Sequence, residues 1–542
     1  MNFIALESAR KLRGGFYTQP GIASFLAQWV MERKPRSLLE PSCGDGAFLQ
    51  AARQRQDGGL AMRTVACEID PDEAAKARRR VPARRGSEVQ IHTMDFLDWF
   101  LSQGKKHERF DAVLGNPPFI RYQYLPEQQQ LLAQKIITRF GLPFTKHTNA
   151  WVPFLVASLD LLAPGGRLGM VIPSELFHIP HAESARRFLA AHCARALILD
   201  PEELWFDGAL QGVVLLLAEK TAPSGPRQGL AVHVVRKEDL LREPAARFFD
   251  KAGFALPPEG KWMRQFLSKR EHSLLEALES DPRFARFERL ADVDVGIVTG
   301  ANRFFLVPDD VVEQFKLHPW AHAMIGRSEH MPGVIYTRSD QTRNATARVP
   351  TNFLWFNEPD RSRYPDSVLE YLRQGEAQAI HSRYKCRVRE PWFRVPSVYA
   401  APVCMVKRAH HFPRLILNQA KVFTTDTVYR IQPRRRSASD LVYSSVNSLT
   451  ALSAELEGRH YGGGVLELVP SEIERLLLPL SSAAPTELTR LDARIRVCEP
   501  PQDILQAQDR RLLAPCGLSV PDQQLLSSAW NRLRQRRQRA SI

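Results

Sequence analysis

The feature that most constrains the fold is a regular alternation of short apolar runs with helical stretches between residues 36 and 220. RSLLEPSCGDGAFLQAARQ predicts a strand, a glycine loop and a helix, and TVACEID, VQIHTMDF and FDAVLGNPPF predict three more strands. A helix over WVPFLVASLDLLAPGG precedes the predicted strands RLGMVIP, RALILD and GVVLLLAEK. This alternation is typical of an α/β fold with a doubly wound, mostly parallel sheet. In such sheets, ligands bind at the carboxyl ends of the strands.

The loops at these strand ends carry candidate ligand-binding residues. In the first loop they are Glu40, Ser42, Gly44 and Gly46. Small residues there allow a ligand to approach the backbone at a helix start, and the missing third glycine disfavours a dinucleotide-binding dehydrogenase. Glu68 ends the second strand, where it can accept hydrogen bonds from ribose hydroxyls, and Asp95 ends the third, where it can accept from an adenine amino group. Glycine loop, ribose acid and adenine acid together describe a nucleoside pocket.

The fourth strand runs into the loop Asn116-Pro117-Pro118-Phe119. Two successive prolines fix φ and remove two backbone donors, so the loop is stiff and its carbonyls can accept hydrogen bonds from a ligand. An ordinary strand-ending turn has a similar composition. The neighbouring motifs therefore decide between a turn and a ligand site.

Taken in order, these motifs resemble the gamma-class N6-adenine DNA methyltransferases of bacterial restriction-modification systems. The matching segments lie between residues 14 and 220 and are GGFYTQP, LLEPSCGDGAF, ACEID, MDF, GNPPF, LLAPGGRLGMVIPSELF and LWFDGALQGVVLLLAEK. The resemblance implies a Rossmann-like catalytic domain that uses S-adenosyl-L-methionine. It also implies site-specific methylation of a flipped-out adenine in double-stranded DNA.

The resemblance gives the Asn-Pro-Pro loop a catalytic role. The Asn116 side-chain oxygen and the Pro117 carbonyl would accept both hydrogens of the adenine amine and aim its lone pair at the methyl group. Pro118 would hold this geometry, and Phe119 would stack on the base. Phe119 stands where tyrosine is frequent in the family, which removes a hydroxyl but keeps the ring. Asparagine before the prolines favours adenine, whereas serine is more typical of cytosine N4 methylation.

Two further residues take their roles from the resemblance alone. Phe206 would face the base from the other side, and Thr18 would contact the methionine part of the cofactor. Flipping a base costs a few kcal/mol, and stacking on an aromatic ring contributes about 1–3 kcal/mol per base. Two aromatic contacts could therefore offset most of the cost of flipping.

Charge and cysteine content limit the partners and the compartment. The 74 Lys and Arg against 59 Asp and Glu leave a net charge of +15, which favours a polyanion such as nucleic acid, although a merely basic surface is the alternative. Seven scattered cysteines without a C-x-x-C pattern argue against disulfides and zinc, so no metal is expected. Without a long apolar run or a leader, we expect a cytoplasmic protein with no membrane segment.

At 542 residues the chain exceeds the size of one core, so we expect a catalytic domain over residues 1–245 and an α+β target-recognition domain over 246–542. Pro- and Gly-rich segments predict a linker between about 221 and 265. VGIVTGANRFFLV, YKCRVREPWFRVP and GRHYGGGVLELVPSE also resemble the family's recognition region. A monomer would contain both functions.

The second half contains arginine-rich clusters that suit DNA. The candidate contacts are Arg383, Lys385, Arg387, Arg389 and Arg394. Alternation in RYKCRVR predicts the first four on one face of an extended strand, mostly facing phosphates. Trp392 is expected in a core, and the basic run 532–539 is expected to be a solvated tail.

Other functions stay open at this point. The loop would also suit another planar amino group, namely cytosine N4, an RNA base or a protein glutamine, although the large basic second half disfavours the last. A DNA-binding specificity module without activity is a further alternative. The sequence has no obvious nuclease motif, so any restriction endonuclease acting on the same site is expected to be a separate polypeptide.

Overall fold

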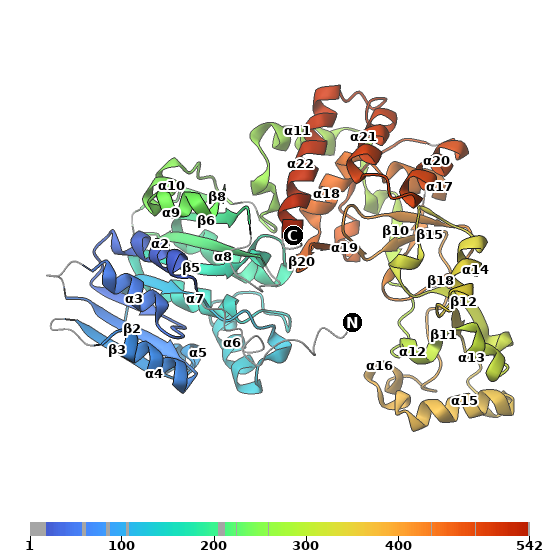
Figure 1. Cartoon of the computed structure of the whole chain (residues 1–542), viewed down its shortest axis with the longest axis horizontal. Helices are drawn as coiled ribbons and strands as arrows, with labels where there is room; N and C mark the ends of the chain where they lie inside the picture. Colours follow the sequence, from blue (N-terminus) through green and yellow to red (C-terminus); the bar gives the residue numbers. More distant parts are fainter. Residues whose placement is uncertain are drawn as a thin grey trace. The chain divides into compact units, whose positions relative to one another are not determined.

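The computed structural model describes residues 18–56, 61–82, 87–103, 108–203, 212–223, 225–257, 259–434, 436–482 and 484–539. The chain forms two compact units, an N-terminal unit of residues 1–266 with the last four residues, and a C-terminal unit of residues 267–538 (Figure 1). The domain boundary predicted after residue 245 lies inside the N-terminal unit. The catalytic and recognition roles of the two units stay predictions.

The N-terminal unit contains an eight-stranded sheet in the order β3-β2-β1-β4-β5-β7-β6-β8. Its strands are β1 (Ser37–Glu40), β2 (Arg63–Glu68), β3 (Glu88–Thr93), β4 (Phe110–Gly115), β5 (Leu162–Pro173), β6 (Cys193–Pro201), β7 (Val213–Lys220) and β8 (Gly229–Val235). β7 runs antiparallel to β5 and β6, and the other neighbours are parallel. β1 pairs with both β2 and β4, so the strand order reverses at β1, and this is where ligands bind in doubly wound sheets. The predicted Rossmann-like fold is confirmed.

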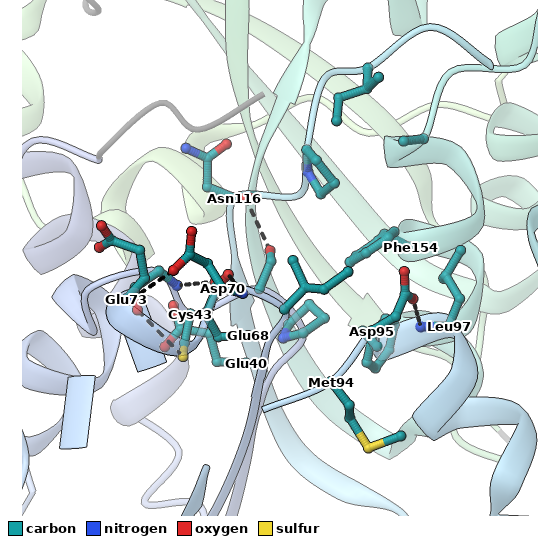
Figure 2. Close-up of a pocket in the computed structure, with 18 of the residues that line it drawn as sticks. Glu40, Cys43, Glu68, Asp70, Glu73, Met94, Asp95, Leu97, Asn116 and Phe154 are labelled. Carbon is teal, nitrogen blue, oxygen red and sulfur yellow. Dashed lines mark hydrogen bonds between the residues drawn. The ribbon is translucent and has the colours of Figure 1, made fainter. Parts of the chain in front are cut away.

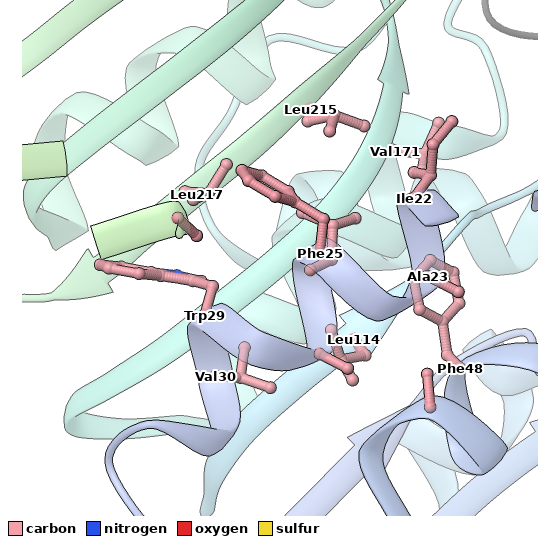
Figure 3. Close-up of a cluster of buried hydrophobic side chains, with 14 of the residues drawn as sticks. Ile22, Ala23, Phe25, Trp29, Val30, Phe48, Leu114, Val171, Leu215 and Leu217 are labelled. Carbon is pink, nitrogen blue, oxygen red and sulfur yellow. The ribbon is translucent and has the colours of Figure 1, made fainter. Parts of the chain in front are cut away.

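Helices cover this sheet. They are α2 (Pro20–Met31), α3 (Ala47–Gln54), α4 (Pro71–Arg80), α5 (Phe96–Ser102), α6 (Glu127–Arg139), α7 (Trp151–Leu161), α8 (Glu183–His192), α9 (Lys237–Arg242) and α10 (Ala245–Lys251). α2 begins with Pro20 and places Phe25 and Trp29 against strand residues such as Leu215 (Figure 3). Burial of each such side chain contributes about 1.5–3 kcal/mol, so α2 holds the sheet on which the strand-end loops sit.

The predicted linker over residues 221–265 is wrong. Residues 229–235 form β8, which pairs in parallel with β6 and completes the sheet. Phe249 of α10 is buried, and its ring lies 4.3 Å from that of Trp29 of α2. The Pro- and Gly-rich stretches therefore bracket an integral strand and two helices.

The C-terminal unit is α+β, as predicted. Its two larger sheets are β10-β19-β15-β17-β13 and β11-β14-β12-β18. Its strands are β9 (Phe284–Arg286), β10 (Ala291–Asp294), β11 (Leu306–Val307), β12 (Ala321–Ile325), β13 (Ile335–Tyr336), β14 (Asn352–Leu354), β15 (Val403–Val406), β16 (Arg408–Ala409), β17 (Leu415–Asn418), β18 (Phe423–Thr424), β19 (Val428–Pro433), β20 (Arg459–Tyr461), β21 (Val465–Glu467) and β22 (Leu477–Pro479). Its helices are α11 (Lys269–Ser280), α12 (Asn302–Phe305), α13 (Asp309–Gln314), α14 (Arg338–Thr346), α15 (Asp366–Ala377), α16 (Tyr384–Arg387), α17 (Ala438–Ser444), α18 (Ser448–Glu457), α19 (Pro470–Ile473), α20 (Pro485–Arg496), α21 (Pro501–Leu512) and α22 (Val520–Gln538).

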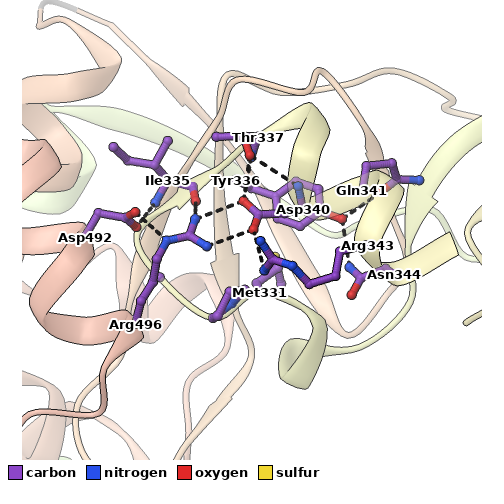
Figure 4. A network of polar contacts seen from close by, with 12 residues as sticks. Met331, Ile335, Tyr336, Thr337, Asp340, Gln341, Arg343, Asn344, Asp492 and Arg496 are labelled. Atoms are coloured by element: carbon purple, nitrogen blue, oxygen red, sulfur yellow. Dashed lines mark hydrogen bonds and ion pairs between the residues drawn. The ribbon is translucent and has the colours of Figure 1, made fainter. Parts of the chain in front are cut away.

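A polar network joins α20 to β13 and α14 in this unit (Figure 4). Arg496 of α20 donates to both carboxylate oxygens of Asp340, at 2.8 and 2.9 Å, and to the Ile335 carbonyl. Asp492 accepts from the backbone amides of Val334 and Ile335 at 2.7 and 2.8 Å. Burial raises the pKa of Asp340, but the hydrogen bonds from Arg496 and Thr337, with the charge of Arg496, together outweigh burial and lower it to about 2. Asp340 is therefore ionised at neutral pH, and its contacts with Arg496 connect α20 to β13 and α14.

The basic run 532–539 is not a solvated tail, so this prediction is wrong. Arg537 on α22 is fully buried and makes a two-pronged contact with the fully buried Glu455 of α18, at 2.7 and 3.0 Å. Arg532 of α22 donates to Glu271 of α11 at 2.6 Å. The end of α22 is therefore part of the core of the C-terminal unit.

A buried carboxylate makes the stability of this unit depend on pH. Asp509 of α21 accepts a hydrogen bond from the Ser448 backbone amide at 2.8 Å, and burial raises its pKa to about 6, against 3.8 when unshifted. Between these values the folded chain keeps a proton that the unfolded chain has released, so the free energy of unfolding falls as pH rises. We expect it to fall by about 2–3 kcal/mol relative to Asp509→Asn between pH ~4 and ~6.5, and then to stay level.

Urea denaturation at a series of pH values measures this difference. Asp503→Asn is the control, because Asp503 is exposed on the same helix. Its curve should run parallel to that of the wild type. Parallel curves for the wild type and Asp509→Asn would contradict the role assigned to Asp509.

Candidate functional site

A pocket of about 430 Å³ opens in the N-terminal unit where β1, β2, β3 and β4 end (Figure 2). Of the sequence-predicted residues, those that line it are Thr18, Glu40, Ser42, Gly44, Glu68, Asp95, Asn116 and Pro118. Figure 2 shows Glu68 and Glu73 towards one end and Asp95 with Phe154 towards the other. The strand-end motifs thus converge on one cavity, as the strand order requires.

The two glycines after β1 have different tasks. Gly44 has φ +51°, and a Cβ there would meet no atom within 4 Å, so its backbone faces open space in the pocket. Gly46 has φ +86°, and a Cβ there would lie 3.1 Å from the Ala77 Cα. Gly46 therefore permits close packing against α4, whereas Gly44 permits a ligand to approach.

Glu68, at the end of β2, connects the loop after β1 to the loop after β2 through hydrogen bonds. Its carboxylate accepts from the Gly44 amide at 2.8 Å and from the Asp70 amide at 2.9 Å. Burial raises its pKa, and these two amide hydrogen bonds oppose the rise. Each oxygen is thereby fixed at the pocket wall, with its remaining lone pair able to accept from a ligand hydroxyl.

Glu40, at the end of β1, is the most unusual residue of the pocket. Its side chain is 1% exposed, and neither carboxylate oxygen has a hydrogen-bond partner among the described residues. Burial, followed by the charges of Glu68 and Asp45, raises its pKa well above the usual range, and the nearby Leu49 backbone amide, which makes no hydrogen bond of good geometry to it, opposes the rise only in part. A buried carboxylate without partners is costly, so the site fits a ligand that brings a donor or a positive charge.

The other end of the pocket suits a flat ring. Asp95 accepts from the Leu97 amide at 2.7 Å and caps α5, and burial raises its pKa. Phe154 and Phe96 line the wall beside it, with ring centroids 5.3 Å apart. Ile69, directly after Glu68, also lines the pocket and is 56% exposed. A carboxylate acceptor beside apolar faces can bind an amino-substituted aromatic ring.

Asn116 is oriented by two hydroxyl groups. Its side-chain Nδ2 donates to Thr18 Oγ1 at 3.2 Å, and its backbone carbonyl accepts from Ser42 Oγ at 3.1 Å. The first contact uses the donor end of the amide, so Oδ1 is the end turned away from Thr18. Thr18 and Ser42 were predicted as cofactor contacts, and in the structure both bind Asn116.

Neither of the two aromatic rings that were predicted to stack on the base, those of Phe119 and Phe206, is among the described residues that line the pocket. Phe119 is half-buried and packs against the apolar cluster that includes α2, and it does not belong to the pocket lining. Phe206 lies outside the described residues. Pro117, within the loop, is buried and does not belong to the pocket lining. Stacking of a base between Phe119 and Phe206 stays a prediction.

Two family models match successive parts of the chain. The Eco57I restriction-modification methylase matches residues 68–204, and the C-terminal domain of the type II methyltransferase M.Eco57I matches residues 259–513. The chain belongs to the DNA methyltransferases of bacterial restriction-modification systems. The two matches include the predicted motifs between Glu68 and residue 177 and most of the C-terminal unit of this methyltransferase, whereas the motif at residues 204–220 lies almost wholly between them.

Relatives that are similar to this chain over most of its length, or over about a third of it, are methyltransferases of the same family. The type II methyltransferase M.AccI of Acinetobacter calcoaceticus is 22% identical over 488 residues, which cover 87% of this chain and 86% of that protein. M.XamI of Xanthomonas campestris pv. amaranthicola is 23% identical over 487 residues, which cover 86% of this chain and 85% of that protein. M.TthHB8I of Thermus thermophilus is 32% identical over 191 residues, or 34% of this chain and 40% of that protein.

The predicted DNA-contacting residues of the methyltransferase do not form a strand. Residues Tyr384–Arg387 form the helical turn α16, so the prediction of one extended face is wrong. Arg389 does not point to solvent, because it donates to the carbonyls of Thr299 at 2.8 Å and Val298 at 2.6 Å. The exposed basic residues of this region are Arg383, Lys385, Arg387 and Arg394. Arg389 is thus a structural residue.

Trp392 packs in a core, as predicted. Its ring lies 5.4 Å from that of Phe304, and its indole donates to Glu376 at 3.2 Å. Among the residues that the structure describes, no three His, Cys, Asp or Glu side chains are grouped to hold a metal ion. The same residues include no helix long and apolar enough to cross a membrane.

Sequence reasoning missed several pocket residues. Ile69 could have been found, because it follows directly on Glu68 at the end of a strand. Phe154 gives no such signal, since it lies in the uniformly apolar run of α7. The contact between Thr18 and Asn116 joins residues 98 positions apart and has no local signature.

Proposed function

We propose that this methyltransferase transfers a methyl group from S-adenosyl-L-methionine to the N6 amino group of an adenine in double-stranded DNA. The observation that carries the proposal is the orientation of Asn116, held by Thr18 and Ser42 at the wall of a pocket rich in carboxylates. This arrangement places an acceptor for an amine, the Asn116 side chain, beside a pocket that suits a cationic cofactor.

The pocket fits S-adenosyl-L-methionine by charge and by shape. Its acidic and basic lining residues are Glu40, Asp45, Glu68, Asp70, Asp72, Glu73, Asp95 and Lys76. This excess of carboxylates suits a ligand with a sulfonium and an ammonium group and disfavours the pyrophosphate of a dinucleotide. The partnerless carboxylate of Glu40 would bind the amino group, Glu68 the ribose hydroxyls, and Asp95 the adenine amine between apolar walls.

The reaction needs little beyond positioning. The bound cofactor supplies a methyl group on a sulfonium, which is already activated. The exocyclic amine of adenine is a weak nucleophile, because its lone pair is delocalised into the ring. Asn116 Oδ1 and the Pro117 carbonyl would accept its two hydrogens, localise the lone pair and stabilise the positive charge that grows on nitrogen. Pro117 and Pro118 restrict the loop, so these acceptors need no reorganisation.

The choice of adenine in duplex DNA rests on separate arguments. Asparagine at position 116 favours adenine over cytosine N4, and the exposed cations of the C-terminal unit suit a nucleic acid. The target base would be flipped out of the duplex towards the Asn116 loop, beside the cofactor pocket, and stacked on Phe119 and Phe206. Modification by a monomer in the bacterial cytoplasm would protect host DNA from a separately encoded endonuclease. Intact Asn116, Glu68 and Asp95 in one pocket speak against an inactive specificity module.

Analysis of nucleosides tests the proposal. The purified protein is incubated with S-adenosyl-L-methionine and unmethylated genomic DNA, and the digested nucleosides are measured by mass spectrometry. We expect N6-methyladenine, and sequencing sensitive to the modification would then give the recognition site. N4-methylcytosine would overturn the choice of base, and unmodified DNA despite bound cofactor would overturn DNA as the substrate.

Glu40 should couple cofactor binding to stability. We expect Glu40→Gln to weaken binding of S-adenosyl-L-methionine by about 1.5–3 kcal/mol, because a charge-assisted hydrogen bond is lost. At pH values above the raised pKa of Glu40, the cofactor-free variant should melt at a higher temperature than the wild type, since it buries no carboxylate charge. Titration calorimetry and thermal denaturation measure the two effects.

The pH dependence and a neighbouring variant control this prediction. Because the pKa of Glu40 is raised, wild-type affinity should fall as pH drops through that pKa, and Glu40→Gln should lose this dependence. Asp45→Asn is the matched control, because the Asp45 carboxylate is already paired with Arg80 at 2.8 Å. Equal losses of affinity in both variants would mean that general pocket charge, and not Glu40, binds the cofactor.

A further inference from the structure

The helical turn α16 presents apolar side chains to solvent in a basic setting. Tyr384 and Val388 are 65% and 66% exposed. They are four residues apart at a helical turn, so they lie on the same side of it. Lys385 Nζ and Arg387 Cζ lie 5.5 and 5.6 Å from the centre of the Tyr384 ring. The turn therefore shows an apolar centre with cations beside it.

The cations around α16 differ from other arginines of the C-terminal unit in their ion-pair partners. Within the described residues, no carboxylate lies within 4.0 Å of the charged groups of Arg383, Lys385, Arg387 or Arg394, so none has an ion-pair partner. Nearby, Arg361 pairs with Glu376 at 2.6 Å, and elsewhere in the unit Arg430 pairs with Asp294 at 2.7 Å. Arginines that are paired with carboxylates, such as these two, stabilise the fold. The charges around α16 remain to bind a polyanion.

The turn is held rigidly in place. Cys386 is fully buried beneath it, and Arg389 donates to two carbonyls of the neighbouring loop, those of Val298 and Thr299. Gly300 in that loop has φ +79°, and a Cβ there would lie 2.7 Å from the Lys385 Cβ. Only glycine allows the loop to pack this closely. Tyr384 and Val388 are thus exposed on a preorganised surface, not on a loose loop.

We propose that α16 contacts duplex DNA and that Tyr384 and Val388 enter the duplex against its bases, while the surrounding cations bind phosphates. This inference rests on the proposed function for the identity of the ligand. Duplex DNA has the complementary pattern, because flat apolar bases lie between rows of phosphates. Apolar side chains that partly unstack a base step are a known means of opening a duplex. The new element is the apolar pair, which would supply contact energy that salt does not screen.

Salt dependence separates the two kinds of contact. Each phosphate contact contributes about 0.9 to the slope of log affinity against log salt, whereas stacking contributes affinity without changing the slope. Binding is measured by fluorescence anisotropy at about 50–200 mM KCl, with a labelled duplex carrying the site that is methylated in genomic DNA. We expect Tyr384→Ala to bind about ten-fold more weakly at an unchanged slope, and Tyr384→Phe to bind like the wild type. Arg387→Gln should lower the slope by about 0.9.

Val388 has a closely matched control on the same unit. Val497 follows α20 as Val388 follows α16, with φ −86° and ψ 9° against φ −87° and ψ 6°. Val497 is 76% exposed, so Val388→Ala and Val497→Ala should change folding stability equally little. We expect only Val388→Ala to weaken DNA binding. Replacing a base near the site by 2-aminopurine should show a fluorescence rise with the wild type that Tyr384→Ala loses.

The outcomes distinguish this inference from the proposed function. A wild type that neither binds nor methylates DNA overturns both. A wild type that methylates DNA, with Tyr384→Ala and Val388→Ala binding like their controls, overturns the contact alone and assigns the exposed pair to a protein partner. Weaker binding by Tyr384→Ala with the reduced slope of Arg387→Gln also overturns it, because the ring would then only position phosphate contacts.

Discussion

Replacing Asn116 by alanine should lower the rate of methyl transfer by about 10²–10³-fold or more while leaving cofactor affinity within about two-fold. In the proposed mechanism the side chain offers one of the two acceptors for the amine, and the substitution leaves the Glu40, Glu68 and Asp95 carboxylates of the pocket unchanged. Single-turnover transfer from labelled S-adenosyl-L-methionine measures the chemical step, and titration calorimetry measures binding.

Thr18 provides the matched control for this prediction. Thr18→Val removes the hydroxyl that accepts from Asn116 Nδ2, whereas Thr18→Ser keeps it. We expect Thr18→Val to lower the single-turnover rate by about ten-fold and Thr18→Ser to leave it nearly unchanged, because one neutral hydrogen bond is lost or kept. Full activity of Asn116→Ala would contradict the mechanism. Loss of cofactor binding in that variant would assign Asn116 to the cofactor site.

Arg537→Met should destabilise the C-terminal unit by about 3–5 kcal/mol, since it leaves the buried carboxylate of Glu455 without its cation. Burial raises the pKa of Glu455, but the charge and hydrogen bonds of Arg537, together with those of His460, outweigh burial and lower it to about 2. The carboxylate is therefore ionised at neutral pH, and its charge has to be compensated. Urea denaturation followed by tryptophan fluorescence measures the change.

Two further variants test whether the loss of stability in Arg537→Met comes from the unpaired Glu455 carboxylate. Arg510→Met places the same substitution at an exposed position of α21 and should cost less than about 0.5 kcal/mol. Glu455→Leu combined with Arg537→Met removes both charges and should recover much of the stability lost in the single variant. A small loss for Arg537→Met alone would show that the ion pair does not stabilise the unit.

The sequence predicted the N-terminal sheet and the pocket well because their signals are local. Each strand is a short apolar run, and Glu40, Glu68, Asp95 and Asn116 stand at or directly beyond strand ends, which topology brings together. What failed depends on distant partners. Glu455 lies 82 residues from Arg537, so a basic run looked like a solvated tail.

The two remaining errors have related causes. Proline and glycine on both sides of the β8 segment predict a linker, although the pairing of this segment with β6 decides its structure. The four residues of α16 alternate like a strand, but hydrogen bonds from Arg389 to a loop about 90 residues away fix the region as a turn. Short segments take the conformation that tertiary contacts impose.

The packing of α22 has a consequence for how the chain is made. α22 buries Trp530 and Leu533, packs against α18, and pairs through Arg532 with Glu271 of α11, the first helix of the C-terminal unit. At about 5–20 residues per second, a ribosome needs roughly 15–50 seconds to pass from α11 to the end of α22. During this time α18 lacks its main partner, so the unit reaches its folded state only after α22 has emerged from the ribosome. Chains released before α22 would expose the apolar surface of α18 to aggregation.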